Sequence, residues 1–190
     1  ADGKNERALV PTKGLEYSPS YSADGQWVVY TVEREGQSDI YRIHPDGSGL
    51  QQLTSDPAFD DQGALSPDGR TLAFVSTRSG GTAGIWLMDI NSKTYTNLTK
   101  HSSGNFRPSW SPDGVHLVYP VLDETTGNGN LLIFDILDEV VWLAAENVDD
   151  ALLYFYYTTC KSVSKLNVLF YVYYCTCVYA HSHSLFYVDN

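Results

Sequence analysis

Three aspartates recur at a regular spacing and are the first candidates for chemistry. Asp24, Asp68 and Asp113 each precede a glycine, and the intervals between them are 44 and 45 residues. Carboxylates brought together by a repeat could hold a divalent cation. Their contexts, YSADG, LSPDG and WSPDG, favour another role, because serine, proline, aspartate and glycine are the residues that build tight turns. We interpret the three aspartates as turn residues and expect no metal site from them.

A second acidic candidate is the pair Asp60 and Asp61, in AFDDQG. The pair stands just before an expected innermost strand, where two carboxylates near a central channel could bind a cation. We interpret the pair as solvated loop charge instead. The histidines at 44, 101 and 116 are scattered over different repeats, and we interpret each as a surface or strand residue.

Motifs that would support catalysis are missing from the sequence. Gly47-Ser48-Gly49 reads as a tight turn, and no Gly-x-Ser-x-Gly, phosphate-binding glycine loop or His-Glu-x-x-His occurs. SADGQW, residues 22–27, is similar to the Asp-box of sialidase-type propellers, but its glycine comes one place early. Asn97-Leu98-Thr99 is a glycosylation sequon that would matter only in a secreted chain. We expect no catalytic, cofactor-binding or metal-ligating residues, and so no enzyme and no cofactor.

The repeated turns connect short apolar runs that we predict to be β-strands. Each turn is followed by a run that is apolar at consecutive positions, which is typical of a strand covered on both faces. A second and a third strand follow in each unit, and a short strand precedes each turn. The runs after the turns are residues 27–32, 71–76 and 116–121; the second strands are 39–44, 84–90 and 130–136; the third are 50–54, 95–99 and 140–144.

Four short strands in every unit of 44 or 45 residues predict the blades of a β-propeller. The fold class is therefore all-β, a partial β-propeller of about three four-stranded antiparallel blades. We assign residues 1–145 to these repeats, as an incomplete ring. The segment ADGKNERALV matches PDGSGLQQLT of the next unit, so the chain starts inside a unit.

Several longer motifs resemble the WD40-like (PD40) repeats of the TolB family. They are FRPSWSPDG (106–114), LAFVSTR (72–78), DIYRIHPDGSGLQQLT (39–54) and GIWLMDI (84–90), and the resemblance covers about residues 1–136. It implies a propeller that binds other proteins and is periplasmic in that family. Similar repeats form the non-catalytic propellers of prolyl-oligopeptidase-type serine peptidases and domains attached to some amidohydrolases. The chain departs from the pattern in having too few blades for a closed ring, and Gly63 replaces the proline of the other units.

The charge of the chain limits which kinds of binding partner are expected. The formal net charge is −11, and no cluster of lysine and arginine occurs, which argues against nucleic acid and against an anionic membrane surface. We therefore expect a non-catalytic propeller module whose partner is another protein. The alternative is that the chain is a fragment of the propeller of a larger hydrolase, either a prolyl-oligopeptidase-type peptidase or an amidohydrolase.

Residues 146–190 form a tail of different composition, with 8 of the 14 tyrosines, all three cysteines, and neither glycine nor proline. A membrane helix centred on residues 166–180 would be shorter than the roughly 20 residues that a span needs. Cys175, Cys177, His181 and His183 could ligate a metal, but their spacing is not a common zinc pattern. We favour a third interpretation, in which the tail lies outside the native reading frame, because the repeat period is lost, glycine and proline are absent and charged residues become rare.

Overall fold

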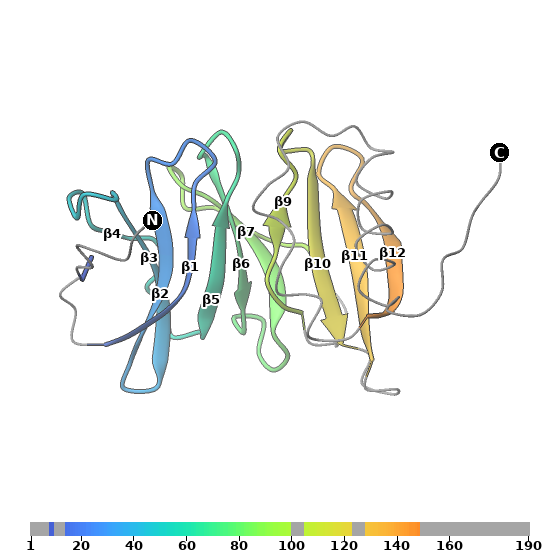
Figure 1. Cartoon of the computed structure of the whole chain (residues 1–190). Coiled ribbons are helices and arrows are strands. Elements are labelled where there is room, and N and C mark those ends of the chain that lie inside the picture. The colour runs from blue at the N-terminus through green and yellow to red at the C-terminus, as the bar shows by residue number, and fades with distance from the viewer. Residues whose placement is uncertain (1–7, 10–13, 100–104, 123–127, 149–190) are drawn as a thin grey trace, which may run out of the picture.

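The computed structural model in Figure 1 describes residues 8–9, 14–99, 105–122 and 128–148. The regular elements in these ranges are all β-strands, and they form three antiparallel sheets of four strands each. Each sheet uses four consecutive strands of the chain, so the sheets are the blades that the repeat predicts. The expected fold, a partial β-propeller of three blades, is confirmed.

Within each blade the strands pair in chain order. The three blades comprise β1 (Leu15–Tyr21), β2 (Val28–Arg34), β3 (Gln37–Ile43) and β4 (Gln51–Gln52); β5 (Asp60–Leu65), β6 (Thr71–Ser76), β7 (Gly84–Asp89) and β8 (Tyr95–Asn97); and β9 (Ser109–Trp110), β10 (His116–Leu122), β11 (Gly129–Asp135) and β12 (Val140–Val148).

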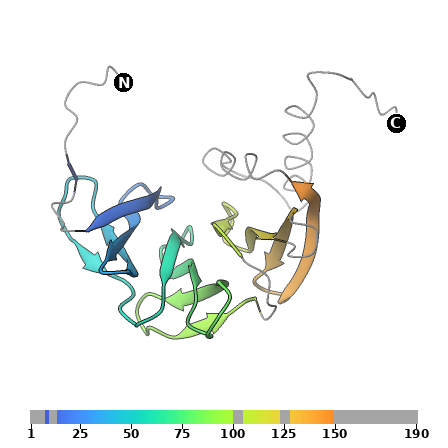
Figure 2. The same ribbon diagram turned by 90° about the horizontal axis from the view of Figure 1, so that it is seen from below.

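The blades stand side by side along an open arc, with β1, β5 and β9 on its concave side (Figure 2). The antiparallel order gives every blade two distinct ends. The turn end, uppermost in Figure 1, carries the Asp-Gly turns at residues 22–27, 66–70 and 111–115. The loop end carries the β2–β3 and β6–β7 hairpins and the β4–β5 connection. Residues 60 and 78 therefore lie at the same end of the second blade.

The second strand of each blade is buried on both of its faces, as the consecutive apolar runs predict. One face of β6 packs with Phe74 and Leu72 against Val29 and Ile40 of the first blade. Its other face packs with Ala73 and Val75 against the third blade, where the partners are Leu117, Tyr119, Val121 and Phe134. Every blade thus depends on its neighbour for its core.

Three aromatic residues from the predicted strands test the alignment of the units. Phe74 and Tyr119 are fully buried at equivalent positions, each on the face turned toward the preceding blade. Trp27 is only half-buried and packs on the opposite face, against the core between the first and second blades. Tyr30 is the first-blade equivalent of Phe74, and it is buried with Val28, Val32 and Ile43.

The outermost strand differs in length between the blades. In the first two blades it is two and three residues long, and just beyond it Thr54 Oγ1 accepts the Ile40 N–H (2.9 Å) and Thr99 Oγ1 accepts the Ile85 N–H (2.8 Å). The hydroxyl takes the place of a backbone partner. In the third blade Ala145 pairs with Leu131, and the pairing continues to Val148. The third strands predicted at 50–54 and 95–99 are therefore shorter than expected, and the one at 140–144 is longer.

The innermost strands share a feature that the sequence analysis does not predict. Ser18, Gln62 and Arg107 occupy equivalent positions and have φ angles of 50°, 57° and 38°. The β1 and β5 ladders are interrupted at these points, as in a β-bulge. The next residue in the second blade is Gly63, where an added Cβ would lie 2.9 Å from Ile40 Cγ2. Close packing on the first blade thus accounts for glycine at this position.

Phe74→Ala should destabilise the fold strongly, because it removes a fully buried ring from the core between two blades. We expect a loss of about 3–5 kcal/mol in the free energy of unfolding, measured by urea denaturation. Phe59→Ala in the same blade is the matched control, since Phe59 is 41% exposed and its removal should cost roughly 0.5 kcal/mol or less. Equal losses for the two variants would contradict the assigned core.

Candidate functional site

The three repeated aspartates are structural turn residues, as the sequence predicts. Asp68 Oδ1 accepts hydrogen bonds from Ser66 Oγ (2.6 Å) and from the Arg70 N–H (3.1 Å). Ser66 Oγ in turn accepts the Thr71 N–H at 2.9 Å, and Gly69 closes the turn with a φ of 71°. The same bonds form around Asp24 and Asp113, with Ser22 and Ser111 as the serines. Each carboxylate is used within its own turn.

Hydrogen bonds to the turn carboxylates favour their charged form. The bond from Ser22 lowers the pKa of Asp24, and the bond from Ser66 lowers the pKa of Asp68. Burial acts in the opposite direction on Asp113, but the bonds from Ser111 Oγ and the Val115 N–H outweigh it and lower its pKa. Nowhere in the described residues do three or more histidine, cysteine, aspartate or glutamate side chains meet in an arrangement that could hold a metal ion.

The expectation that Asp60 and Asp61 are solvated loop charge is wrong. Both residues are buried, and they begin β5 rather than a loop. Asp61 Oδ1 accepts hydrogen bonds from Thr31 Oγ1 of the first blade (2.8 Å) and from the Gln62 N–H (2.6 Å). Burial of a carboxylate is costly unless it is paired, so both residues require the partners they have.

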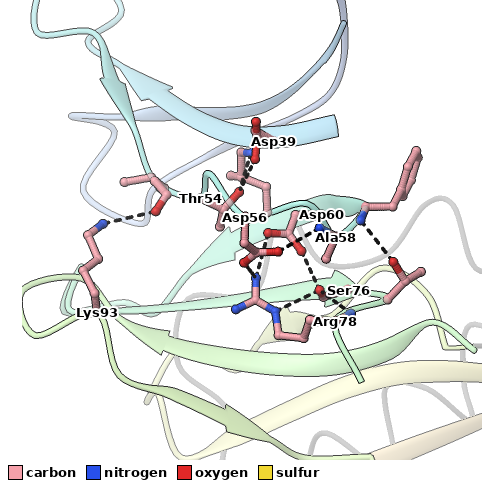
Figure 3. Close-up of polar contacts among 12 residues, drawn as sticks. Asp39, Thr54, Asp56, Ala58, Asp60, Ser76, Arg78 and Lys93 are labelled. Carbon is pink, nitrogen blue, oxygen red and sulfur yellow. Dashed lines mark hydrogen bonds and ion pairs between the residues drawn. The ribbon is translucent and has the colours of Figure 1, made fainter. Parts of the chain in front are cut away.

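Asp60 belongs to a buried ion-pair network at the loop end (Figure 3). Arg78 Nη2 lies 2.7 Å from Asp60 Oδ2 and 2.8 Å from Asp56 Oδ2. Ser76 Oγ donates to Asp60 Oδ1 (2.5 Å) and accepts from Arg78 Nε (2.9 Å). Burial raises the pKa of Asp60, while Ser76 and Arg78 oppose that rise. The network joins the β4–β5 connection to the end of β6.

Aromatic rings enclose the same guanidinium. Its carbon lies 4.0 Å from the centroid of Tyr95, 4.9 Å from Phe74 and 5.3 Å from Trp86. These distances are typical of cation–π contacts. The arginine therefore has carboxylates on one side and rings around it, which is an arrangement for holding strands together rather than for binding a solvent ion.

The sequence analysis did not single out Arg78, although a signal was present. Arg34 precedes it by 44 residues, the interval of the first two Asp-Gly turns; Arg34 ends β2, and Arg78 lies two residues after β6. Arg34 also lies over an aromatic ring, that of Tyr41, at 5.9 Å. A search for basic residues at the repeat interval would have found the pair.

His44, His116 and the sequon considered in the sequence analysis lie in different parts of the structure. His44 stacks on Trp27, and His116 begins β10, with Nε2 3.5 Å from Asp135 Oδ2. The Asn97 side chain accepts the Thr99 N–H (3.0 Å), so the sequon forms a local turn. His101 and the four tail residues Cys175, Cys177, His181 and His183 lie outside the described residues. In the described ranges no helix has the length and apolar character needed to cross a membrane.

Exposed apolar side chains occur at the loop end of all three blades. Leu15 begins β1 and is 63% exposed, Phe59 precedes β5, and Phe106 precedes β9 and is 40% exposed. The Phe59 N–H donates to Thr77 Oγ1 and its carbonyl oxygen accepts the Thr77 N–H, while the Phe106 N–H donates to the Pro120 carbonyl oxygen. Each blade therefore presents one apolar side chain at the start of its innermost strand.

The fold and its repeated turns agree with one family. A family model, the TolB beta propeller domain, matches residues 2–143. The chain belongs to this family. A solved structure of an Agrobacterium tumefaciens protein assigned as TolB superposes with a TM-score of 0.63 at 26% identity, covering 71% of this chain and 51% of that one.

Two curated relatives show the range of proteins that carry TolB-like repeats. An uncharacterised protein of Agrobacterium fabrum is 30% identical over 128 residues, which are 62% of this chain and 44% of that protein. An uncharacterised peptidase of Bacillus subtilis is 31% identical over 109 residues, 54% of this chain and 17% of the peptidase. The chain thus spans less than half the length of these relatives.

Asp68→Asn should change how stability depends on pH. The pKa of Asp68 is lowered in the folded state, so its charged form contributes stability above the ordinary carboxyl pKa of 3.8, and that contribution is lost as the pH falls toward the lower folded value. As the pH falls from 5 to below 3.8, the free energy of unfolding should therefore decrease less for the variant than for the parent chain. Urea titrations at a series of pH values measure this difference. Identical pH profiles would contradict the assigned role.

Arg78→Met should be strongly destabilising, because it leaves the buried Asp60 carboxylate without its cation. Breaking such a pair costs about 3–5 kcal/mol. Without Arg78 the folded-state pKa of Asp60 should rise further, so the loss should be smaller at pH 4 than at pH 8. The double variant Arg78→Met/Asp60→Asn should recover much of the loss in the same urea titrations. No recovery would mean that Arg78 acts through its ring contacts alone.

Proposed function

We propose that this chain is a non-catalytic β-propeller module that binds another protein through the loop end of its blades. Its membership of the TolB family supports this role. The observation that carries the proposal is the set of exposed apolar side chains Leu15, Phe59 and Phe106, one in each blade at the same end. Apolar side chains that recur at one end of a rigid scaffold are suited to a protein interface.

The hydrogen bonds made by the serine side chains support a non-catalytic role. The serines of the turns, Ser22, Ser66 and Ser111, are bonded to aspartates, and Ser76 is bonded to Asp60. A serine nucleophile needs a neighbouring base such as histidine, and each of these hydroxyls instead donates to a carboxylate that is itself part of a turn or an ion pair. These groups stabilise the blades.

A second candidate function comes from the relationship to the Bacillus subtilis peptidase, of which the chain matches 17%. In this case the propeller would be the accessory domain of a larger hydrolase. A hydrolase segment encoded beside the repeats in the complete gene would favour this function. The two functions share the fold and differ in whether a catalytic domain is attached.

Site-specific crosslinking tests the proposed interface. Phe106 or Phe59 is replaced by p-benzoylphenylalanine in the full chain, which is then irradiated in an extract of the source cells. We expect one discrete protein adduct from both positions. Thr96, exposed on the outer strand β8, is the matched control and should give none.

Two results would overturn this proposal. One is an equal yield of adducts at Thr96 and Phe106, which would indicate non-specific contact. The other is labelling of the purified chain by a fluorophosphonate probe, because such a probe reacts with activated serine nucleophiles.

A further inference from the structure

Three side chains of the first blade form a stack on the face turned toward the second blade. The rings of Trp27 and His44 lie 3.8 Å apart at an angle of 28°, and the Arg42 guanidinium carbon lies 4.1 Å from the Trp27 ring centroid. His44 Nδ1 is 2.7 Å from the carbonyl oxygen of Gln26. Arg42 stacks on an indole that is itself stacked on an imidazole, and this contact restricts the orientation of the arginine.

Hydrogen bonds fix the Arg42 guanidinium further but use only part of its capacity. Its Nε and Nη2 both donate to Gln51 Oε1, at 2.9 and 2.8 Å. A guanidinium carries five N–H donors, so three remain, including both on Nη1. Among the described residues Arg42 has no carboxylate within ion-pair distance. The arginine is therefore held flat with one edge still able to donate.

A second cation reaches the same strand from the neighbouring blade. Lys93, in the turn before β8, donates from Nζ to the Leu53 carbonyl oxygen at 3.2 Å (Figure 3). Leu53 is two residues beyond Gln51, which is about 7 Å along an extended chain. Within the described part of the chain Lys93 also forms no ion pair.

The charges of the two residues are uncompensated. Burial lowers the pKa of Arg42, and burial together with the positive charge of Arg42 lowers the pKa of Lys93. Neither cation has a carboxylate within ion-pair distance among the described residues, although the chain has a net charge of −11. A bound anion would offset the repulsion between the two cations.

We propose that Arg42 and Lys93 form an oxyanion-binding site at the seam between the outer strands of the first two blades. The free edge of Arg42 suits the two oxygens of a carboxylate or phosphate group, and Lys93 supplies a second charge. Trp27, His44 and Gln51 position the arginine. The site is separate from the loop-end interface, so it does not depend on the proposed function.

Titration of the full chain with two small anions tests the site. Inorganic phosphate and acetate are added separately, each against chloride at the same ionic strength. Binding is followed in ¹H–¹⁵N spectra at the Arg42 Nε–H and the Trp27 indole N–H. We expect saturable shifts at both groups. Saturation by both anions would identify a general oxyanion site, and saturation by phosphate alone would assign it to phosphate groups.

Substitutions separate this site from general charge attraction. Lys93 lies in an exposed turn, so Lys93→Gln should keep the fold while weakening anion binding roughly tenfold. Arg42→Lys should weaken binding by a similar factor, because a lysine lacks the paired N–H donors of the guanidinium. Arg70→Gln removes the same charge from a side chain that is 77% exposed and should change the affinity less than about twofold. Linear, non-saturating shifts, or an equal loss in Arg70→Gln, would overturn the proposal.

Discussion

The structure depends on one constraint, which is that the second strand of every blade must be covered on both faces. Strands β2, β6 and β10 are apolar at consecutive positions, so a blade alone would leave one apolar face in water. Between the blades the neighbouring blade supplies that cover, as Phe74 and Tyr119 show, while Tyr30 on the outer face of the first blade is covered by Leu9 and Tyr41. The serine–aspartate turns serve this constraint, because they set the register that places the apolar faces opposite each other.

Hydrogen bonds and ion pairs connect the elements at the loop end and between the first two blades. At the loop end, Arg78 joins the connection between blades to the end of β6 through Asp56 and Asp60. Between the first and second blades, Thr31 of one reaches Asp61 of the other. These bonds cross from element to element, so they specify how blades meet as well as how each is built. The exposed apolar residues of the loop end are then held on a rigid frame.

Much of the fold could be predicted from the sequence, because the repeat carries it. Asp24, Asp68 and Asp113 marked the turns, and the apolar runs marked the strands that need two neighbours. The partners of Asp60 could not be predicted, since its pairing with Arg78 depends on how a connection folds back on a hairpin. The bulges at Ser18, Gln62 and Arg107 were also missed, because no residue type is shared at those positions. The stack of Trp27, His44 and Arg42 could not be predicted either, because it depends on the register in which β2 and β3 pair.

The different lengths of the outermost strands have a consequence for colloidal behaviour. The rim strands β4 and β8 have only two and three residues, so they offer little backbone for pairing with another chain. In contrast, β12 is nine residues long, with Val141 and Leu143 half-exposed. A long apolar edge is a template for intermolecular pairing. Of the three outermost strands in the described part of the chain, β12 therefore has the longest backbone that could pair with another strand.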